Sequence, residues 1–283
     1  MTSLPPDRLI LVTGATGKSG RRIAERLLNA GRRVRLGSRS AEPRFDWADS
    51  RTWDAALDGV AAVYVAYQPD LAEPGALETV TAFFSRAKEA GVSRIVLLSG
   101  RGEPVAEAAE AALKESGVDW TILRAAWFMQ NFSEAFFLDL VRSGEVILPT
   151  GMAAEPFIDL EDLADVAVVA LTEDGHARRL YEVTGPEALT FDDAIRQIAD
   201  AAGFNVPVSH IPPDEYAALL RRTGVPEVEV GLWLYMFTTI LDGRNTPTAP
   251  GIQQALGRPA STFAAYAERT AATGVWAKEP VLG

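Results

Sequence analysis

The chain has 283 residues, 48% of them hydrophobic, which is enough for one large domain or for a domain with a smaller lobe. It contains no cysteine, so disulfides, thiol catalysis and cysteine-bound metals are excluded. Its only two histidines, His176 and His210, lie far apart in the sequence, and we therefore expect no metal site.

The formal net charge of −11 argues against a nucleic-acid partner. No apolar run approaches the roughly 20 residues that span a membrane, and the first residues lack the pattern of a signal peptide. We therefore expect a cytoplasmic protein that acts on a small molecule and has no membrane partner. The sequence leaves open whether the chain forms a homodimer.

The N-terminal region predicts a strand that turns sharply into a helix. An apolar run at 9–12 leads into three glycines spaced G-x-x-G-x-x-G, and a helical stripe follows up to Gly31. Such a turn leaves backbone N–H groups unpaired at the positive end of the helix, which suits a pyrophosphate. Glycine avoids a Cβ that would block the turn or the phosphate. We assign to this phosphate-binding loop Gly14, Thr16, Gly17, Lys18, Ser19 and Gly20.

Strands and helices then alternate through the first two-thirds of the chain. The apolar runs predict strands at 33–37, 61–66, 94–99 and 120–124, a short strand ending near 45–46, and helices over 77–91 and 104–117. This alternation implies parallel strands joined by right-handed helical crossovers. We predict an α/β fold with a doubly wound parallel Rossmann sheet.

The pattern changes after the strand at 120–124. It predicts an aromatic-rich helix over 128–142, a strand at 145–148, a helix over 162–171, a last sheet strand at 179–184, and mostly helix with proline-rich joints from Phe191 onward. We divide the chain into an NAD(P)-binding Rossmann core at 1–155, to which the strand at 179–184 returns, and a smaller, mainly helical substrate lobe at 156–283. In open α/β sheets, ligands bind at the carboxyl ends of the strands.

The end of the second strand indicates which dinucleotide binds. An acidic residue there would hold the ribose hydroxyls of NAD, but the sequence reads Gly37-Ser38-Arg39-Ser40. Arg39 offers a planar fork of donors to a 2′-phosphate, and Ser38 adds a hydroxyl. One charge-assisted hydrogen bond, worth about 1.5–3 kcal/mol, would favour NADPH by about 10- to 100-fold. We therefore predict NADP(H) as the cofactor, with a solvated arginine as the alternative.

Asp46 and Trp47 are expected to flank the adenine, although an indole that only packs the end of a strand is the alternative. Arg101 and Glu103, after the strand at 94–99, are candidates for lining the pocket, and a pair between the two is the favoured alternative. Glu107, Glu110 and Glu115 are interpreted as a solvated helix face, supported by a pair between Glu110 and Lys114 four residues apart.

Several segments resemble the NmrA-like branch of the atypical short-chain dehydrogenases/reductases. They are the glycine loop at 13–20 and the segments at 110–124, 128–132, 157–164 and 181–190, which follow the family's order over roughly residues 8–205. Members include NADPH-dependent quinone and dye reductases, iminium reductases of ergot-alkaloid pathways, and NmrA itself, a cofactor-binding regulator. The resemblance implies a Rossmann fold with bound NADP(H) and does not settle the activity.

The chain departs from typical short-chain dehydrogenases in lacking their proton-transfer pair, a tyrosine four residues before a lysine. The residues four positions before its four lysines are glycine, phenylalanine, glutamate and glycine. Hydride transfer needs little acid–base help when the acceptor is already electron-poor, as a quinone, an imine or iminium, or a conjugated enone is. We therefore predict an NADPH-dependent reductase of a small, electron-poor organic acceptor.

Candidate catalytic residues follow the strands at 61–66 and 94–99. Tyr67 is expected to give a proton or a hydrogen bond to a developing anion, and Ser99 to hold the nicotinamide or a substrate oxygen. A packing ring and a serine that caps local backbone are the respective alternatives. Ala66, Tyr67 and Ser99 are also expected to contact the cofactor.

Trp127, Phe128 and Asn131, after the strand at 120–124, are predicted to bind the substrate. They adjoin an aromatic stripe at Phe132, Phe136 and Phe137, and such a stripe at helical spacing is more often core than pocket. Further aromatic residues, Trp233, Tyr235 and Phe237 with Met236, either cover a pocket or pack the late helices.

Two other functions fit the same residues. A redox sensor would bind NADP(H) and signal through a protein partner, and the missing tyrosine–lysine pair supports it as well as a reductase. A third possibility is that NADP serves a redox-neutral isomerisation or only the structure. Consumption of NADPH with an acceptor distinguishes the reductase from both.

Overall fold

The computed structural model describes residues 3–71, 73–149 and 151–277. Contacts divide the chain into two compact units. The first comprises Met1–Ala125, Leu160–Val183 and Pro250–Pro259, and the second comprises Ala126–Asp159, Thr184–Ala249 and Ala260–Gly283. This grouping by contacts differs from the predicted division at residue 155, because the chain passes between the units several times. The functional roles given to the two parts stay predictions.

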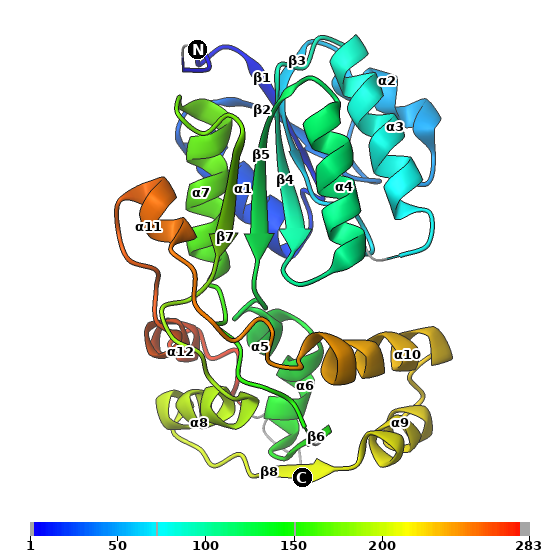
Figure 1. Cartoon of the computed structure of the whole chain (residues 1–283). Coiled ribbons are helices and arrows are strands. Elements are labelled where there is room, and N and C mark those ends of the chain that lie inside the picture. The colour runs from blue at the N-terminus through cyan, green and yellow to red at the C-terminus, as the bar shows by residue number, and fades with distance from the viewer. Residues whose placement is uncertain (1–2, 72, 150, 278–283) are drawn as a thin grey trace. The chain divides into compact units, whose positions relative to one another are not determined.

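The first unit is built on a six-stranded sheet with the order β2-β1-β3-β4-β5-β7 (Figure 1). All neighbouring strands are parallel. The strands are β1 (Leu9–Thr13), β2 (Arg33–Gly37), β3 (Val60–Val65), β4 (Arg94–Gly100), β5 (Asp119–Ala125) and β7 (Arg179–Val183). The chain starts at β1, runs to the neighbouring edge strand β2 and then returns to the other side of β1. The doubly wound parallel fold is therefore confirmed, with its reversal of strand order between β1 and β3.

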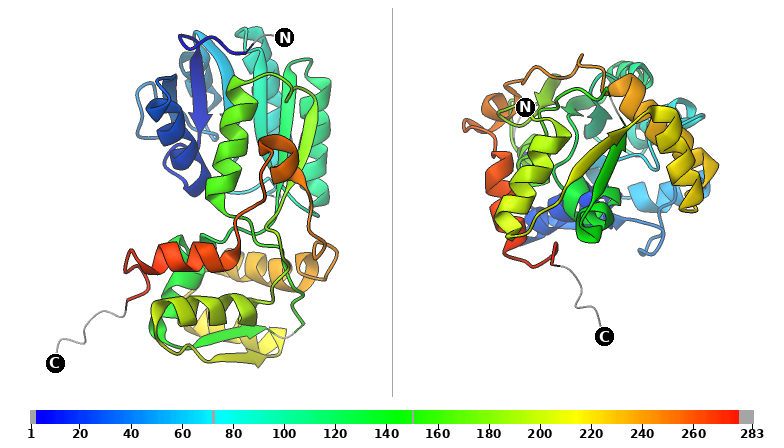
Figure 2. Two further views of the ribbon diagram at one scale, coloured as in Figure 1. Left: turned by 90° about the vertical axis from the view of Figure 1, so that its left-hand side faces the viewer. Right: turned by 90° about the horizontal axis from the view of Figure 1, so that it is seen from below.

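Helices cover both faces of this sheet (Figures 1 and 2). On one face α1 (Lys18–Asn29) packs against α7 (Leu160–Thr172), and the other face carries α2 (Trp53–Leu57), α3 (Ala76–Glu89) and α4 (Pro104–Glu115). The short α11 (Gly251–Leu256) lies beside α7 and β7. Strand β3 is buried along its whole length, as expected for a central parallel strand covered on both sides.

The short strand expected near 45–46 is absent, and residues 38–49 connect β2 to a 3₁₀ turn, η1 (Ser50–Thr52), without a strand. Phe45 is nevertheless buried, and Trp53 Nε1 donates to the carbonyl oxygen of Asp46 at 3.0 Å. Phe45, near which the strand was expected to end, therefore packs a loop into the core of the first unit. The same hydrophobic pattern serves both structures, so local sequence did not separate them.

The second unit is mainly helical. Its elements are α5 (Asn131–Glu134), α6 (Phe136–Ser143), β6 (Val146–Pro149), α8 (Phe191–Ala202), β8 (Val208–Ile211), α9 (Pro213–Arg222), α10 (Glu227–Tyr235), the π-helical turn η2 (Met236–Ile240) and α12 (Phe263–Ala271). Strands β6 and β8 form a two-stranded parallel sheet. The predicted helix at 128–142 is interrupted at Ala135, whose backbone is extended, and β8, flanked by prolines, was not predicted.

An aromatic core holds the second unit together. Phe132 stacks on Phe137 with ring centroids 5.0 Å apart, and Phe157 meets Phe191 edge-on at 5.2 Å. Phe132 and Phe137 are fully buried, so these two residues of the aromatic stripe belong to the core. The side chain of Phe136 lies outside the described residues. No helix in the described part of the chain is both long enough and apolar enough to cross a membrane.

Candidate functional site

The glycine loop, residues 14–20, joins β1 to α1 with no space for side chains at its tightest points. Gly14 has φ of +62°, a left-handed conformation that favours glycine. A Cβ on Gly20 would overlap the carbonyl oxygen of Gly14 and lie 2.6 Å from its carbonyl carbon. Gly17, which has no capping side chain, occupies the N-cap position of α1. The loop thus has the geometry of an anion site made of backbone N–H groups at the positive end of a helix.

Gln68, in the loop after β3, reaches this glycine loop. Its side-chain Nε2 would lie 3.2 Å from a Cβ on Gly17 and 4.0 Å from one on Gly14. The amide therefore stands beside the N-terminus of α1, where it can donate a hydrogen bond to a bound anion. Sequence patterns do not reveal this role of Gln68, because only the pairing of β1 with β3 brings the later loop to the glycine loop.

The carboxyl ends of β1 and β3 are tied together at the site. The backbone N–H of Ala66 donates to Thr13 Oγ1 at 2.9 Å, and Thr13 Oγ1 donates to the carbonyl oxygen of Tyr64 at 3.0 Å. Thr13 is completely buried. These bonds fix the position of Ala66, one of the predicted cofactor contacts, relative to the start of the glycine loop.

Trp47 packs into the first unit. Its Nε1 donates to the carbonyl oxygen of Ala66 at 3.2 Å, and its ring centroid lies 4.9 Å from that of Phe83 and 5.1 Å from that of Tyr67. The indole therefore packs the loop after β2 against the loop after β3. Contacts of Trp47 with adenine, and of Tyr67 with substrate or cofactor, stay predictions.

The residues after β2 present an arginine to solvent. Arg39 is exposed and makes no hydrogen bond with the described residues, while Ser38 Oγ lies 3.3 Å from Ser40 Oγ. Asp46 accepts from the Ala48 amide at 3.1 Å and from Arg44 Nη2 at 2.6 Å. These bonds, the amide first, hold the pKa of Asp46 below its usual range. The Arg39 guanidinium is thus available to a phosphate beside the end of β2.

Ser99 and Glu110 form a buried hydrogen bond behind the end of β4. Ser99 Oγ donates to Glu110 Oε1 at 2.7 Å, and Arg124 of β5 contacts both carboxylate oxygens, Nε at 2.9 Å and Nη2 at 2.5 Å. Glu110 is completely buried, so its interpretation as part of a solvated face is wrong. Lys114 Nζ lies 3.9 Å from Glu110, but the closest partners come from two neighbouring strands that sequence spacing does not reveal.

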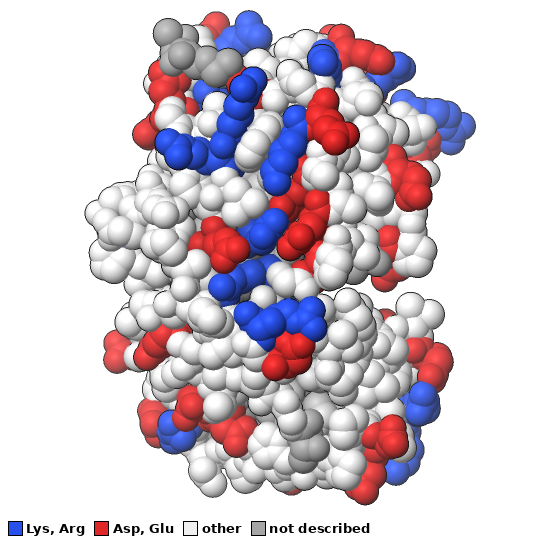
Figure 3. Space-filling model, in the orientation of Figure 1, with Lys and Arg blue, Asp and Glu red and all other residues white. Residues whose placement is uncertain are grey.

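Arg101, in the loop after β4, has Glu182 of β7 as its ion-pair partner, with Nε 3.2 Å from Oε2. The same glutamate lies 3.7 Å from Arg124 Nη1, which is also 3.7 Å from Glu107. Figure 3 shows basic and acidic side chains interleaved on the face of the first unit that carries β7, β5 and α4. Ion pairs thus connect β4, β5, β7 and α4 beside the candidate site.

Glu103 precedes α4 and does not cap it. Its carboxyl group instead folds back over the end of β4, where a Cβ on Gly100 would lie 2.5 Å from Glu103 Cδ and 2.7 Å from Oε2. The side chain is partly buried and makes no hydrogen bond with the described residues. The expected pair between Arg101 and Glu103 is wrong, because Arg101 pairs with Glu182 of β7 instead. The alternative, that Glu103 lines the pocket, stays a prediction.

The predicted substrate residues lie in the second unit. The Trp127 ring meets Phe191 edge-on at 5.6 Å and stacks with Phe237 at 6.0 Å, and it remains partly exposed. Phe128 forms a β-bridge with Ile158 and is also partly exposed, as is Asn131 at the start of α5. Trp233 stacks on the buried Phe237 at 5.6 Å. Aromatic surface is therefore available at Trp127 and Phe128, and its use for substrate stays a prediction.

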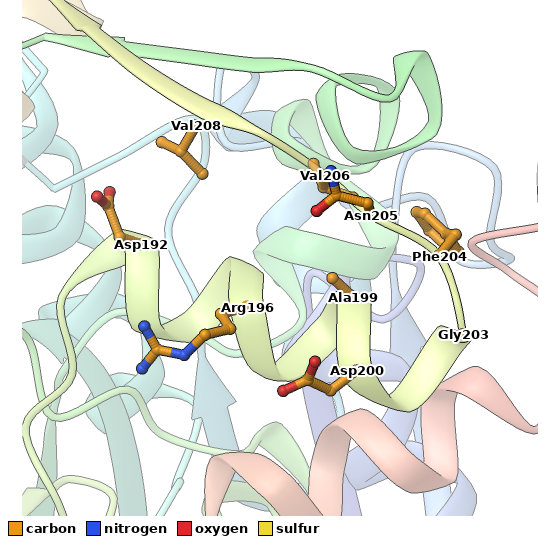
Figure 4. Close-up of a pocket in the computed structure, with 9 residues that line it drawn as sticks. All are labelled: Asp192, Arg196, Ala199, Asp200, Gly203, Phe204, Asn205, Val206 and Val208. Atoms are coloured by element: carbon orange, nitrogen blue, oxygen red, sulfur yellow. The ribbon is translucent and has the colours of Figure 1, made fainter.

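A groove of about 640 Å³ lies elsewhere in the second unit (Figure 4). It is lined by α8 and the segment that leads into β8, with residues Asp192, Arg196, Ala199, Asp200, Gly203, Phe204, Asn205, Val206 and Val208. His210 Nε2 lies 3.0 Å from Asp192, and Arg196 pairs with Asp193. The groove contains none of the predicted site residues, and two of its charged side chains, Asp192 and Arg196, have partners on the surface.

The other histidine, His176, is buried, and its Nδ1 lies 2.9 Å from the hydroxyl of Tyr181. Burial lowers the pKa of His176. Within the described ranges, no three His, Cys, Asp or Glu side chains are grouped to hold a metal ion.

Comparisons with known proteins agree with this geometry. A family model described as NAD(P)H-binding matches residues 14–174. Agroclavine dehydrogenase of Claviceps fusiformis is 31% identical over 280 residues, which cover 91% of this chain and 95% of that protein. The (4-alkanoyl-5-oxo-2,5-dihydrofuran-3-yl)methyl phosphate reductase of Streptomyces griseus is 33% identical over 277 residues, which cover 90% and 95%.

Among solved structures, the triphenylmethane reductase of Citrobacter sp., crystallised with NADP(H), has a similar fold. Its TM-score is 0.73 at 21% identity, and the match covers 93% of this chain and 99% of the reductase. At this identity the similarity supports the fold and leaves the chemistry to be argued from the residues.

Proposed function

The chain belongs to the NAD(P)H-binding family and has the features of its NmrA-like branch, and from this we propose that it is an NADPH-dependent reductase that transfers hydride to a small, electron-poor organic acceptor. The observation that carries the proposal is the tight glycine loop at the N-terminus of α1, within the segment that the family model matches. The family supplies the coarser statement, an oxidoreductase that uses NAD(P)H. The preference for NADPH over NADH and the class of acceptor are part of our proposal.

We propose that the cofactor binds at the carboxyl edge of the sheet. Backbone N–H groups at residues 14–20 and the Gln68 amide would hold the pyrophosphate. Ser38 and Arg39 would hold the 2′-phosphate, and Asp46 and Trp47 would flank the adenine. Ala66, Tyr67 and Ser99, at the ends of β3 and β4, would line the nicotinamide half. When bound, the cofactor supplies the hydride, and the protein supplies position and exclusion of water.

The proposed class of acceptor follows from the tyrosine–lysine pair that the chain lacks. Without a tyrosine–lysine pair, the acceptor must draw the hydride by its own electron deficiency. The names of the relatives are consistent with such acceptors. The Streptomyces griseus enzyme is named for an unsaturated lactone that carries an alkanoyl group, and the Citrobacter enzyme is named for triphenylmethane compounds. A quinone, an imine or iminium, and a conjugated enone are therefore the classes to test.

A panel of such acceptors tests the proposal through the loss of NADPH absorbance. We expect turnover with at least one class and faster turnover with NADPH than with NADH. A protein that binds NADPH but oxidises it with no acceptor would contradict the reductase and favour a redox sensor. We also propose a cytoplasmic location, which cell fractionation tests. Size-exclusion chromatography tests whether the chain forms a homodimer.

Arg39→Ala is expected to raise the Kd for NADPH by about 10- to 100-fold, because it removes one charge-assisted hydrogen bond to the 2′-phosphate. The Kd for NADH should change by less than about twofold. Calorimetry with both nucleotides measures the difference. Arg44→Ala is the matched control, because Arg44 is an exposed arginine of the same loop that already pairs with Asp46. Equal weakening of both nucleotides by Arg39→Ala would place the 2′-phosphate elsewhere.

Tyr67→Phe and Trp127→Ala are expected to lower kcat by about 5- to 10-fold, as the loss of a contact worth about 1 kcal/mol implies. The Kd for NADPH should stay nearly unchanged in both variants. Steady-state kinetics and calorimetry give the two quantities. Val228→Ala, at a position that is 79% exposed, serves as the control in the second unit. Normal turnover in both variants would show that neither residue lies at the substrate.

A further inference from the structure

The end of β4 carries a carboxyl group held in an unusual place. Glu103 does not use its side chain to cap α4, although it occupies the N-cap position. The carboxyl group lies so close over Gly100 that a Cβ there would collide with it. A glycine at position 100 therefore makes room for Glu103 above the strand end.

Two polar residues close to Glu103 in the chain interact with other partners. Ser99 donates its hydroxyl proton to Glu110 at 2.7 Å, and Arg101 pairs with Glu182 at 3.2 Å. Burial, and then the negative charge of Asp70 in the loop after β3, raise the pKa of Glu103 to about 7. At neutral pH a substantial fraction of Glu103 is thus protonated, which a general acid requires.

The strand order would bring Glu103 to the nicotinamide end of a dinucleotide bound at the glycine loop. The glycine loop follows β1, and Arg39, the proposed partner of the 2′-phosphate, follows β2 on one side of it. The adenosine half would then lie over β2, and the nicotinamide half would extend to the other side, over β3 and β4. Neighbouring strands lie about 4.8 Å apart, so the end of β4 is about 10 Å from the end of β1.

We propose that Glu103 is the catalytic proton donor of this reductase when the acceptor is neutral. The inference rests on the proposed function. With a quinone, the hydride adds to the acceptor, and NADPH becomes NADP⁺. The developing oxyanion takes the proton from the Glu103 carboxyl group, which becomes a carboxylate and regains a proton from water. The sum is acceptor, NADPH and one proton going to reduced acceptor and NADP⁺.

A cationic acceptor needs no proton, because hydride alone neutralises it, and this difference gives the test. Glu103→Gln is expected to lower kcat with a neutral quinone by about 100-fold and to leave kcat with a cationic triarylmethane dye within about twofold. Glu115→Gln is the matched control, since Glu115 is an exposed glutamate at the other end of α4. The Kd for NADPH, measured by calorimetry, should be the same in all three proteins.

The pH dependence gives a second readout. Because the acid form is active, kcat/KM of the wild type for the quinone should fall as the pH rises through about 7. The fall should be absent in Glu103→Gln and should move to lower pH in Asp70→Asn, because removing the negative charge lowers the pKa of Glu103. Gly100→Ala displaces the carboxyl group and should also lose quinone turnover selectively.

The outcomes separate the two proposals. If Glu103→Gln reduces the quinone at the wild-type rate, or loses quinone and dye turnover equally, Glu103 is not the proton donor, and the reductase itself stands. If the wild type oxidises NADPH with neither acceptor, the proposed reductase function is contradicted, whatever the role of Glu103.

Discussion

Gly20→Ala is expected to raise the Kd for NADPH by at least about 100-fold. A Cβ at this position would overlap the carbonyl oxygen of Gly14, so the glycine loop must move away from the start of α1. Each charge-assisted hydrogen bond to phosphate is worth about 1.5–3 kcal/mol, and the loss of one or two of them accounts for the change. Calorimetry with NADPH measures the affinity, and circular dichroism establishes that the variant is folded.

The control for this substitution is Gly231→Ala in α10, where an added Cβ meets no atom within 4 Å. It should bind NADPH as the wild type does. Gly17→Ala is an intermediate case, because its Cβ would lie 3.2 Å from both Gln68 Nε2 and the carbonyl oxygen of Gly14. It should weaken binding less than Gly20→Ala. Wild-type affinity in a folded Gly20→Ala protein would mean that the dinucleotide does not lie on this loop.

Arg124→Met is expected to lower the free energy of unfolding by about 3 kcal/mol, the low end of the cost of breaking a buried ion pair. Glu110 is completely buried, and Arg124 contacts both of its carboxylate oxygens. Without Arg124, that carboxylate keeps only the Ser99 hydroxyl at 2.7 Å and the more distant Lys114 at 3.9 Å. Urea unfolding at neutral pH measures the loss.

Two further variants test whether the loss of stability in Arg124→Met comes from leaving the buried Glu110 carboxylate without its ion-pair partner. Glu110→Met should cost less than Arg124→Met, because Arg124 is partly exposed and has Glu107 and Glu182 each 3.7 Å away. The double variant should recover much of the stability, because replacing both partners of a buried pair by apolar side chains is often neutral or stabilising. The exposed Glu115→Gln should change stability by less than about 0.5 kcal/mol. If Arg124→Met costs no more than this control, the buried pair contributes little.

The Glu110 pair shows where sequence spacing misleads. A glutamate four residues before a lysine on a predicted helix is typical of a solvated pair. The partners that bury this glutamate, Ser99 and Arg124, stand on β4 and β5 and are joined to it only by the packing of α4 on the sheet. Arg101 likewise pairs with Glu182, far along the chain, because β7 returns beside β5.

The sequence by itself determined the fold class and the position of the glycine loop of this protein. Both depend on local signals, namely apolar runs that alternate with helical stripes and glycines whose spacing the sharp turn after β1 requires. Only the tertiary structure decided that residues 38–49 form a packed loop, that Gln68 lies against the glycine loop, and that Glu103 folds over Gly100. The reason is physical: burial and the pKa of a side chain depend on neighbours from distant segments, which strand pairing and helix packing bring together.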